Sequence, residues 1–490
     1  MLRQKNESAS IFRSLDWPVI VIYLIMVLAG VVSIYSASYD FDHASLFAFE
    51  EFSGKQIRWI LMAFGLALAL LLIETRLYET YAYPVYILMV ILLAITPLIA
   101  PDIKGSRSWL VMGPMSLQPA EFAKVATSLA LARLFASYNF TLNSGALNYV
   151  KACAIILVPF VLIILQKETG SALVFLSLFF VLYREGMTGL LLFGAALAVF
   201  IFVVSVSWAD TTIMGMTAGQ FYVLITVMLI MVAMLVIYGK RRMEVARNVL
   251  FFFLASGLVL WILCQFTSVE VNGTPVLLSI IGVSCVYVAI EVLRSRIMAF
   301  FIPVATVFFA IVFLFSVNIA FGHLKDYQQK RILVAFGIVD DPRGVGYNVN
   351  QAKIAIGSGG LAGKGFLEGT QTKLKYVPEQ HTDFILCTIG EEQGFWGTML
   401  VELLFVTLIL RVIAIAERQP TVFGRVYAYC VASIFICHFC INIGMVLGLL
   451  PVIGIPLPFF SYGGSSLWGF TILLFILLRI DASRKSVLSY

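Results

Sequence analysis

A carboxylate, a cation and a glycine turn stand together in one polar stretch, Asp340-Asp341-Pro342-Arg343-Gly344-Val345-Gly346-Tyr347. This stretch is the centre of residues 321–382, the one long polar island between the hydrophobic segments. Asp341 precedes a proline, which restricts its backbone to extended geometry. A carboxylate placed in such a loop could accept a proton from a substrate hydroxyl. The alternative is an ordinary turn in which an aspartate caps a helix, and the spacing alone favours the turn.

A second group combines a basic loop with a charged pair on a predicted helix. The loop is Lys104-Gly105-Ser106-Arg107-Ser108-Trp109. The helix is expected to begin at Pro119, because the first turn does not need the N–H that proline lacks. Glu121 and Lys124 are three residues apart and therefore share a helix face. Ionisable groups inside a membrane are costly and by default mark a site or a pathway; the alternative is a pair that neutralises itself and fixes helix packing.

The third group is rich in proline and glycine and lies near the C-terminus. Between Asn442 and Ser465 the chain contains Leu450-Pro451-Val452-Ile453-Gly454-Ile455-Pro456-Leu457-Pro458-Phe459, which cannot form a straight helix. Irregular backbone at membrane depth must be buried in protein or line a cavity. We expect either the wall of a groove for a lipid tail or a structural re-entrant turn. His438, close by, has no second ligand at metal spacing and is expected to bind nothing.

The composition identifies the class of protein that carries these groups. The 490 residues are 61% hydrophobic and 12% charged, with a mean hydropathy of +0.98. Soluble domains carry about 25% charged residues, so no soluble core could bury this much apolar surface. The sequence therefore predicts an all-α polytopic protein surrounded by membrane lipids. The excess of 33 Lys and Arg over 27 Asp and Glu is modest and needs no nucleic-acid partner.

Long apolar segments predict fourteen transmembrane helices, because a bilayer core of about 30 Å needs about 20 residues per helix. They cover roughly residues 18–37, 56–74, 81–100, 120–136, 149–166, 170–184, 187–208, 219–238, 248–268, 274–292, 297–320, 383–411, 424–448 and 465–480.

The short loops carry Lys and Arg on one side of the predicted membrane, with Lys240-Arg241-Arg242 as a dense run. The positive-inside rule therefore places both termini in the cytoplasm, and parity places the island at 321–382 outside. The island is itself basic, as long translocated loops can be, and a basic outer surface suggests an anionic ligand. Its glycine-rich run Ile356–Gly365 could line an anion with backbone N–H groups.

Together these groups resemble the SEDS family (shape, elongation, division and sporulation), most closely its elongation branch, RodA, rather than its division branch, FtsW. The resemblance covers most of the chain outside residues 209–296. It rests on Gly105–Lys124, Lys325-Asp326-Tyr327-Gln328, Arg331, the turn from Asp341 to Tyr347, Ala355–Gly365, His381–Phe384, Glu391-Glu392, Gly394 and Asn442–Ser465, with Gly369-Thr370-Gln371 and Pro451-Val452-Ile453-Gly454 favouring the elongation branch.

The resemblance implies a peptidoglycan glycosyltransferase of the bacterial cytoplasmic membrane. Such an enzyme polymerises lipid II at the outer face, releases undecaprenyl diphosphate, and works beside a class B penicillin-binding protein that cross-links the strands. The family's essential loop aspartate corresponds to Asp341, its membrane-embedded pair to Glu121 and Lys124, and its loop arginine to Arg107.

These correspondences suggest a mechanism with one base and several cations. Asp341 would accept the proton of the acceptor hydroxyl, Lys124 would keep it ionised by proximity, and Glu121 would orient Lys124. Direct displacement with a single base predicts inversion at the anomeric carbon. A divalent cation, Mg²⁺ or Mn²⁺, could supplement the basic residues, although no cofactor is required and no cage of oxygen ligands is visible.

The remaining expectations concern residues that touch the substrate. The departing diphosphate needs positive charge. We expect Arg107, Lys124, Arg343 and Lys364 at the diphosphate, and Gln118, Tyr347, His381 and Ser461 in the groove.

The chain departs from the family pattern in two places. Family members typically have Gln-Pro-Asp-x-Gly where this chain has Gln166-Lys167-Glu168-Thr169-Gly170, so the acid persists without the proline. The family architecture has ten spans, so we assign the surplus helices to an insertion at 209–296, whose even number leaves the island outside. Two other functions stay open: a flippase for the same lipid-linked sugar, and a non-catalytic scaffold for the penicillin-binding protein.

Overall fold

The structure, a computed structural model, is almost entirely helical. It describes residues 13–39, 51–103, 105–113, 115–239, 242–266, 272–324, 326–335, 337–339, 341, 344 and 346–484. The chain divides into two compact units, Met1–Thr188 with Pro342–Tyr490, and Gly189–Asp341. Within the described ranges, twelve helices are long and apolar enough to cross a membrane. The chain is therefore an all-helical polytopic membrane protein.

The two remaining predicted spans coincide with shorter helices. α5 (Pro119–Phe135) has 17 residues, and the segment at 169–184 is split into α7 (Thr169–Leu176) and α8 (Phe179–Arg184). α5 begins at Pro119 as expected and is buried around nearly its whole circumference, as a helix enclosed by other helices should be. All fourteen predicted segments are helical, and the crossing of the membrane by these two stays a prediction.

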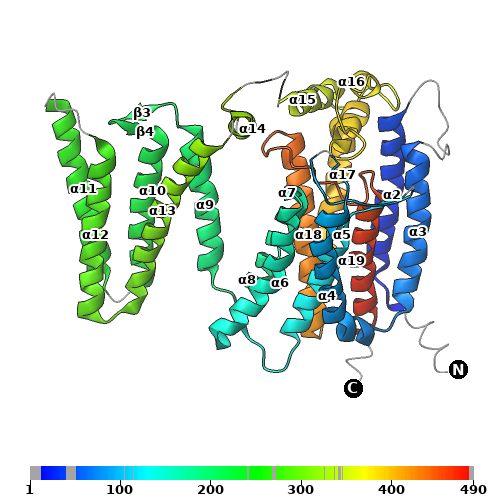
Figure 1. The fold of residues 1–490 in the computed structure, drawn as a ribbon, viewed down its shortest axis with the longest axis horizontal. Helices are drawn as coiled ribbons and strands as arrows, with labels where there is room; N and C mark the ends of the chain where they lie inside the picture. Colours follow the sequence, from blue (N-terminus) through cyan, green and yellow to red (C-terminus); the bar gives the residue numbers. More distant parts are fainter. Residues whose placement is uncertain are drawn as a thin grey trace. The chain divides into compact units, whose positions relative to one another are not determined.

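The first unit surrounds α5, which contacts α4, α6, α18 and α19. Its short helices α15 and α16 lie at one end of the bundle, beside the start of α17 (Figure 1). α17 bends at Gly394, whose φ of +66° suits glycine, and a Cβ there would lie 2.3 Å from the backbone N of Gly363. The other elements of this unit are α2 (Trp17–Ser38), α3 (Phe52–Leu72), α4 (Thr75–Ile99), β1 (Leu110–Met112), β2 (Met115–Leu117), η1 (Leu142–Ser144), α6 (Ala146–Leu165), α15 (Tyr347–Gly359), α16 (Thr370–Lys373), α17 (Ile385–Glu417), α18 (Val422–Val446) and α19 (Gly464–Ala482).

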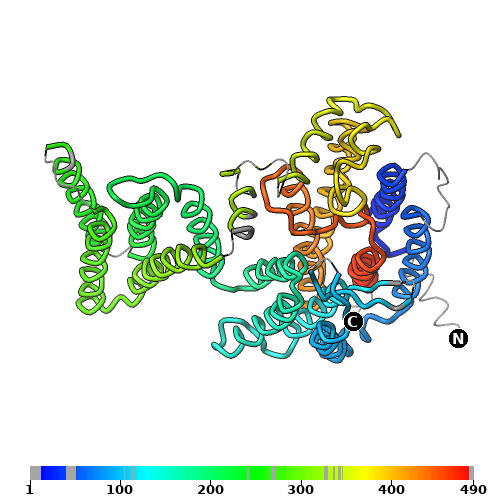
Figure 2. The backbone as a smooth tube through the Cα atoms, turned by 45° about the horizontal axis from the view of Figure 1, so that its top comes forward, coloured from blue at the N-terminus to red at the C-terminus, as the bar shows by residue number. Residues whose placement is uncertain are grey.

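The second unit packs around α10, which contacts α9, α11, α12 and α13 (Figure 2). Its core is hydrophobic and includes Ile201, Leu224, Met231, Val249, Ile281 and Leu314. The elements are α9 (Gly189–Ser207), β3 (Thr212–Ile213), β4 (Met216–Thr217), α10 (Ala218–Tyr238), α11 (Met243–Phe266), α12 (Gly273–Ser295), η2 (Met298–Phe300), α13 (Phe301–His323) and α14 (Asp326–Ala335).

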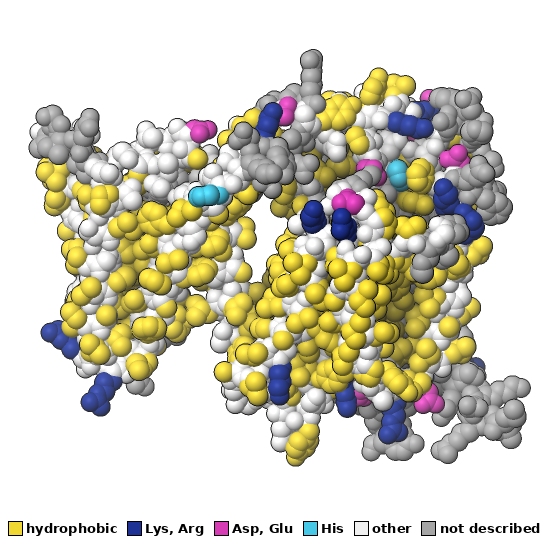
Figure 3. All heavy atoms as spheres, in the orientation of Figure 1, with side chains coloured by type: hydrophobic (Ala, Val, Ile, Leu, Met, Phe, Trp, Pro, Cys, Tyr) yellow, Lys and Arg dark blue, Asp and Glu magenta, His cyan; other side chains and the backbone are white. Residues whose placement is uncertain are grey.

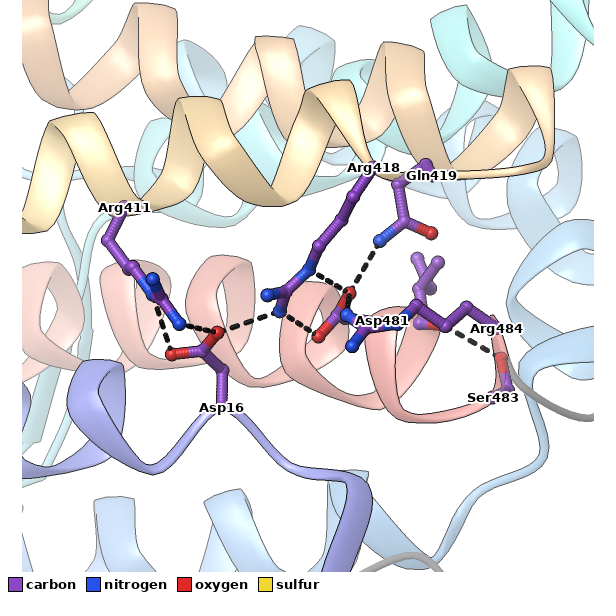
Figure 4. A network of polar contacts seen from close by, with 8 residues as sticks. Asp16, Arg411, Arg418, Gln419, Asp481, Ser483 and Arg484 are labelled. Carbon is purple, nitrogen blue, oxygen red and sulfur yellow. Dashed lines mark hydrogen bonds and ion pairs between the residues drawn. The ribbon is translucent and has the colours of Figure 1, made fainter.

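A network of ion pairs holds the end of the first unit where α2 begins (Figure 4). Asp16 accepts from Arg411 at 3.0 Å and from Arg418 at 2.7 Å, and Arg418 Nε donates to Asp481 Oδ1 at 2.9 Å. Both carboxylates are buried, which requires such partners. Burial alone would raise the pKa of Asp16, but the two arginines hold that pKa below its usual range. The network joins the start of α2 to the ends of α17 and α19.

Candidate functional site

The predicted pair on α5 forms a buried ion pair. The backbone of Gln118 is extended, and α5 begins at Pro119. Lys124 Nζ donates to Glu121 Oε2 at 2.8 Å, and the two side chains are 1% and 3% exposed. A charge removed from water to this extent needs a close partner of opposite sign. The shared helix face expected from the spacing is therefore present.

His438 on α18 completes the surroundings of this ammonium group. Its Nε2 lies 3.0 Å from Lys124 Nζ, and its Nδ1 lies 3.1 Å from the carbonyl oxygen of Pro456. A carbonyl only accepts, so Nδ1 must carry the hydrogen and Nε2 must accept from the ammonium. The Phe470 ring lies 4.7 Å from Nζ and provides a third, cation–π contact. Three partners, Glu121, His438 and Phe470, thus match the three donors of the ammonium.

The sequence interpretation missed this role, since it assigned nothing to His438. One signal could have indicated it: His438 and Asn442 are four residues apart and therefore share the face of α18 toward the proline-rich segment. Asn442 Nδ2 donates to the carbonyls of Ile455 at 2.8 Å and Asp383 at 2.9 Å. Both side chains are buried, so two polar groups at this spacing marked a contact with irregular backbone.

The proline- and glycine-rich segment is braced by side chains on several sides. His438 and Asn442 hold two of its carbonyls, and the backbone N of Leu457 donates to Ser461 Oγ at 2.9 Å. Leu457 and Phe460 are buried. These contacts show a turn that is braced over its second half, whereas Leu450 and Val452 are exposed. A groove for a lipid tail along this segment stays a prediction. Ser461 holds that turn, and its place in a substrate groove stays a prediction.

His381 lies beside this segment, as part of an aromatic cluster. Its ring stacks on Phe52 with centroids 4.2 Å apart, and its carbonyl accepts from the backbone N of Tyr462 at 2.8 Å. Burial raises the pKa of Tyr462. The cluster joins the start of α3 to the start of α19. Tyr347 is half-buried at the first position of α15, and its groove role is likewise untested.

The loop before α5 is tied to the turn before α7. The backbone N of Arg107 donates to the carbonyl of Gln166 at 3.1 Å, and Ser108 Oγ donates to Glu168 Oε2 at 3.0 Å. Burial raises the pKa of Glu168, against hydrogen bonds from Ser108 and Ser106 that lower it. Glu168, the acid that stands where family members have an aspartate, thus contacts the loop that carries Arg107.

Two more predicted residues occupy this end of α5. The Arg107 side chain is 58% exposed, with its Nε 3.9 Å from Asp102 Oδ2. Gln118 is buried, and its Nε2 donates to Ser171 Oγ at 3.4 Å. Arg107 is therefore open to a ligand from solvent, whereas Gln118 already joins α5 to α7.

Lys364, expected at the diphosphate, forms an ion pair with Glu391. Its Nζ lies 2.7 Å from Glu391 Oε1. The Glu391 side chain is 0% exposed, and it also accepts from the backbone N of Gln371 and of Thr372, each at 2.9 Å. The carboxylate thus caps the N-terminus of α16. A diphosphate role would require Lys364 to share its ammonium between Glu391 and the ligand.

Asp341 belongs to the second unit, where its Oδ2 lies 2.9 Å from Lys330 Nζ. The Asp341 side chain is 19% exposed, so the carboxylate is partly desolvated. Arg343 lies outside the described residues. Lys124 belongs to the first unit, and the expected approach of Lys124 and Asp341 stays a prediction. Within the described part of the chain, no three His, Cys, Asp or Glu side chains gather as a metal site.

Comparisons with known proteins point to one family. A family model for the cell-cycle proteins FtsW, RodA and SpoVE matches residues 16–220 and 208–486. The peptidoglycan glycosyltransferase MrdB of Escherichia coli K12 is 30% identical over 433 residues, 88% of this chain and 86% of that protein. The peptidoglycan glycosyltransferase RodA of Treponema pallidum is 28% identical over 437 residues, 88% of this chain and 89% of that protein. A solved chain from work on polymerization and crosslinking by a peptidoglycan synthase complex has the same fold, with a TM-score of 0.59, 22% identity, and 96% and 98% of the two chains covered.

Proposed function

The chain belongs to the FtsW/RodA/SpoVE family, and from this premise we propose that it is a peptidoglycan glycosyltransferase that polymerises lipid II during cell elongation. The observation that carries the proposal is the 30% identity to MrdB along 88% of this chain. The buried pair of Glu121 and Lys124 on α5 and the exposed Arg107 in the loop before α5 support it, because a lipid diphosphate needs cations near the membrane.

Asp341 serves as the base in the proposed reaction. The acceptor GlcNAc 4-oxygen forms a bond to the anomeric carbon of the donor, and its proton passes to the Asp341 carboxylate. The bond from that carbon to the diphosphate breaks, and its electron pair leaves with undecaprenyl diphosphate. One displacement inverts the carbon and yields a β-1,4 link from an α-linked donor. The ion pair with Lys330 orients the carboxylate for this transfer.

The cations divide the work at the diphosphate. Arg107 is exposed and its guanidinium can bind two phosphate oxygens at once, and Arg343 and Lys364 add charge. Lys124 has three partners already, so it reaches the substrate only by exchanging one of them. Its main contribution in this scheme is to join α5 to α18 and, through His438, to the braced turn. A divalent cation from solution, Mg²⁺ or Mn²⁺, would supplement these side chains.

The same proposal covers topology and partner. Fourteen spans, with both termini in the cytoplasm and residues 321–382 outside, agree with the distribution of Lys and Arg. The helices at 209–296 are an insertion that falls within the second unit. A class B penicillin-binding protein is the proposed partner, supported by the similarity in fold to a chain of a peptidoglycan synthase complex.

The test compares two neighbouring carboxylates. The protein, purified in detergent, receives lipid II, and glycan polymer is measured for the parent, Asp341→Asn and Asp340→Asn. We expect a loss of about 10²–10⁴-fold for Asp341→Asn, the contribution of a positioned base, and near-parent activity for Asp340→Asn. If a folded Asp341→Asn variant makes as much glycan polymer as the parent, Asp341 is not the base. Absence of polymer from the parent, even with its partner, rejects the enzyme, and a flippase assay in liposomes follows.

A further inference from the structure

A small groove lies between two helices of the second unit. Its volume is about 230 Å³. Two of its lining residues, Val249 and Ser284, are buried, whereas Phe252 and Val283 are exposed. The lining residues are Asn248, Val249 and Phe252 from α11, and Val283, Ser284 and Tyr287 from α12.

Polar side chains line the groove at one end. Asn248 Nδ2 donates to Tyr287 Oη at 3.0 Å. Asn248 is the lining residue closest to the start of α11, and Tyr287 is the lining residue closest to the end of α12. Phe252 and Val283 lie about one helical turn, roughly 6 Å, deeper. The groove therefore changes from hydrogen-bonding to apolar along the helix axes.

Two arginines stand beyond the polar end. Arg242 Nη1 lies 3.2 Å from Glu291 Oε2, and Arg294 Nη1 lies 3.6 Å from Glu291 Oε1. The arginine side chains are 50% and 71% exposed and the glutamate 11%, so the guanidiniums face outward. Two cations on one carboxylate leave a charge of +1. Tyr287, Glu291 and Arg294 share one face of α12, and Figure 3 shows Lys and Arg side chains at this lower end of the unit, below hydrophobic surface.

We propose that this groove binds one acyl chain of an anionic phospholipid, whose phosphate lies against Arg242 and Arg294. From the arginines inward, the groups along these helices match the parts of such a lipid in order. The guanidinium groups match the phosphate, the Asn248 amide and the Tyr287 phenol match the ester, and the apolar hollow matches the acyl chain. Arg242 directly precedes α11, and the helix rises about 7.5 Å from Met243 to Asn248. Arginine side chains can extend along apolar surface toward the membrane interface. The positive-inside rule assigns the lipid to the inner leaflet.

The shape of the groove favours a lipid over a protein segment. The lining residues span only about one turn of each helix, roughly 6 Å. A transmembrane helix is about 10–12 Å across with its side chains, so the groove is too short to hold one. The charge favours an anionic headgroup, because a zwitterionic lipid would bring its own ammonium toward the arginines. The proposal is independent of the catalytic function.

The test measures lipid affinity on the full-length protein. Delipidated protein in detergent is titrated with phosphatidylglycerol and with phosphatidylcholine of identical chains, and binding is followed by native mass spectrometry. Arg294→Gln should weaken phosphatidylglycerol binding about five-fold, and the double variant with Arg242→Gln about thirty-fold. Glu291→Gln, which removes the competing carboxylate, should tighten it. Arg76→Gln removes a cation from an exposed position of the first unit and should change nothing.

A groove-filling variant separates the groove from the surface charge. Val283 is 55% exposed, so Val283→Trp or Val283→Phe places a ring over the hollow and keeps both arginines. We expect weaker phosphatidylglycerol binding with an unchanged thermal unfolding midpoint. Equal affinity for the two lipids, or phosphatidylglycerol affinity that none of these variants changes, overturns the proposal. A dimer that the ring substitution dissociates assigns the groove to a second copy and also overturns it.

Discussion

His438→Leu removes two hydrogen bonds from a site with no access to water. Leucine fills most of the volume of the imidazole, so the loss is polar and leaves little cavity. The Lys124 ammonium, 1% exposed, loses the acceptor at 3.0 Å, and the Pro456 carbonyl loses the donor at 3.1 Å. A bond to a charged group contributes about 1.5–3 kcal/mol and a neutral one about 1 kcal/mol. We therefore expect a loss of about 3 kcal/mol in the free energy of unfolding.

His438→Gln is the matched control. A glutamine amide can accept from Lys124 through Oε1 and donate to Pro456 through Nε2, which is the polarity deduced for the imidazole. We expect it to cost less than about 1 kcal/mol. Reversible unfolding in mixed micelles, followed by tryptophan fluorescence, measures both variants, and polymerisation of lipid II gives a second readout that leucine should lower and glutamine restore. Equal losses for leucine and glutamine would refute the deduced hydrogen-bond pattern.

Three further predictions use other contacts. The two arginines hold the pKa of Asp16 below its usual value. The ionised carboxylate therefore stabilises the folded protein above about pH 4, and this stabilisation is lost as the pH falls through the lowered pKa of the folded state. Arg418→Gln should move acid unfolding, followed by circular dichroism, to higher pH. Gly359→Ala places a Cβ 1.9 Å from a backbone carbonyl oxygen, and it should lower the free energy of unfolding in urea or detergent by about 1–3 kcal/mol. Gly357→Ala, with nothing within 4 Å of its Cβ, should leave that free energy unchanged or raise it. Similar unfolding midpoints for the two variants would contradict the packing. Arg107→Gln should lower polymerisation at least ten-fold with an unchanged unfolding midpoint, since its side chain is 58% exposed; a large loss of stability instead would show a structural role.

Local features of the sequence predicted the helices and one charged pair. The length of an apolar segment can be read directly from consecutive residues, and all fourteen segments predicted in this way are helical in the structure. The start of α5 at Pro119 and the pair of Glu121 and Lys124 follow from proline chemistry and helix periodicity. The sequence also indicated extra helices, although the compact second unit extends beyond residues 209–296, to Gly189 and Asp341.

Contacts between distant segments were not predictable in the same way. His438 is 314 residues from Lys124, and no periodicity relates them. Lys364 was expected at the substrate diphosphate, and that role stays a prediction. The structure pairs it with Glu391, because a buried carboxylate at the start of a long helix takes the nearest cation and backbone donors. The sequence shows which side chains are charged, whereas the folded structure shows which of them already form ion pairs with other side chains.

This distinction bears on how the cations share the reaction. Lys124 has its three donors occupied, and removing it would leave Glu121 unpaired in a buried position, which costs about 3–5 kcal/mol in other proteins. Loss of activity in a Lys124 variant therefore cannot by itself assign the ammonium to the diphosphate. Arg107 has no such burden, because solvent already surrounds its guanidinium. Within the described part of the site, the exposed arginine is the group whose effect on activity can be separated from its effect on folding, and the buried lysine is the group whose effects cannot.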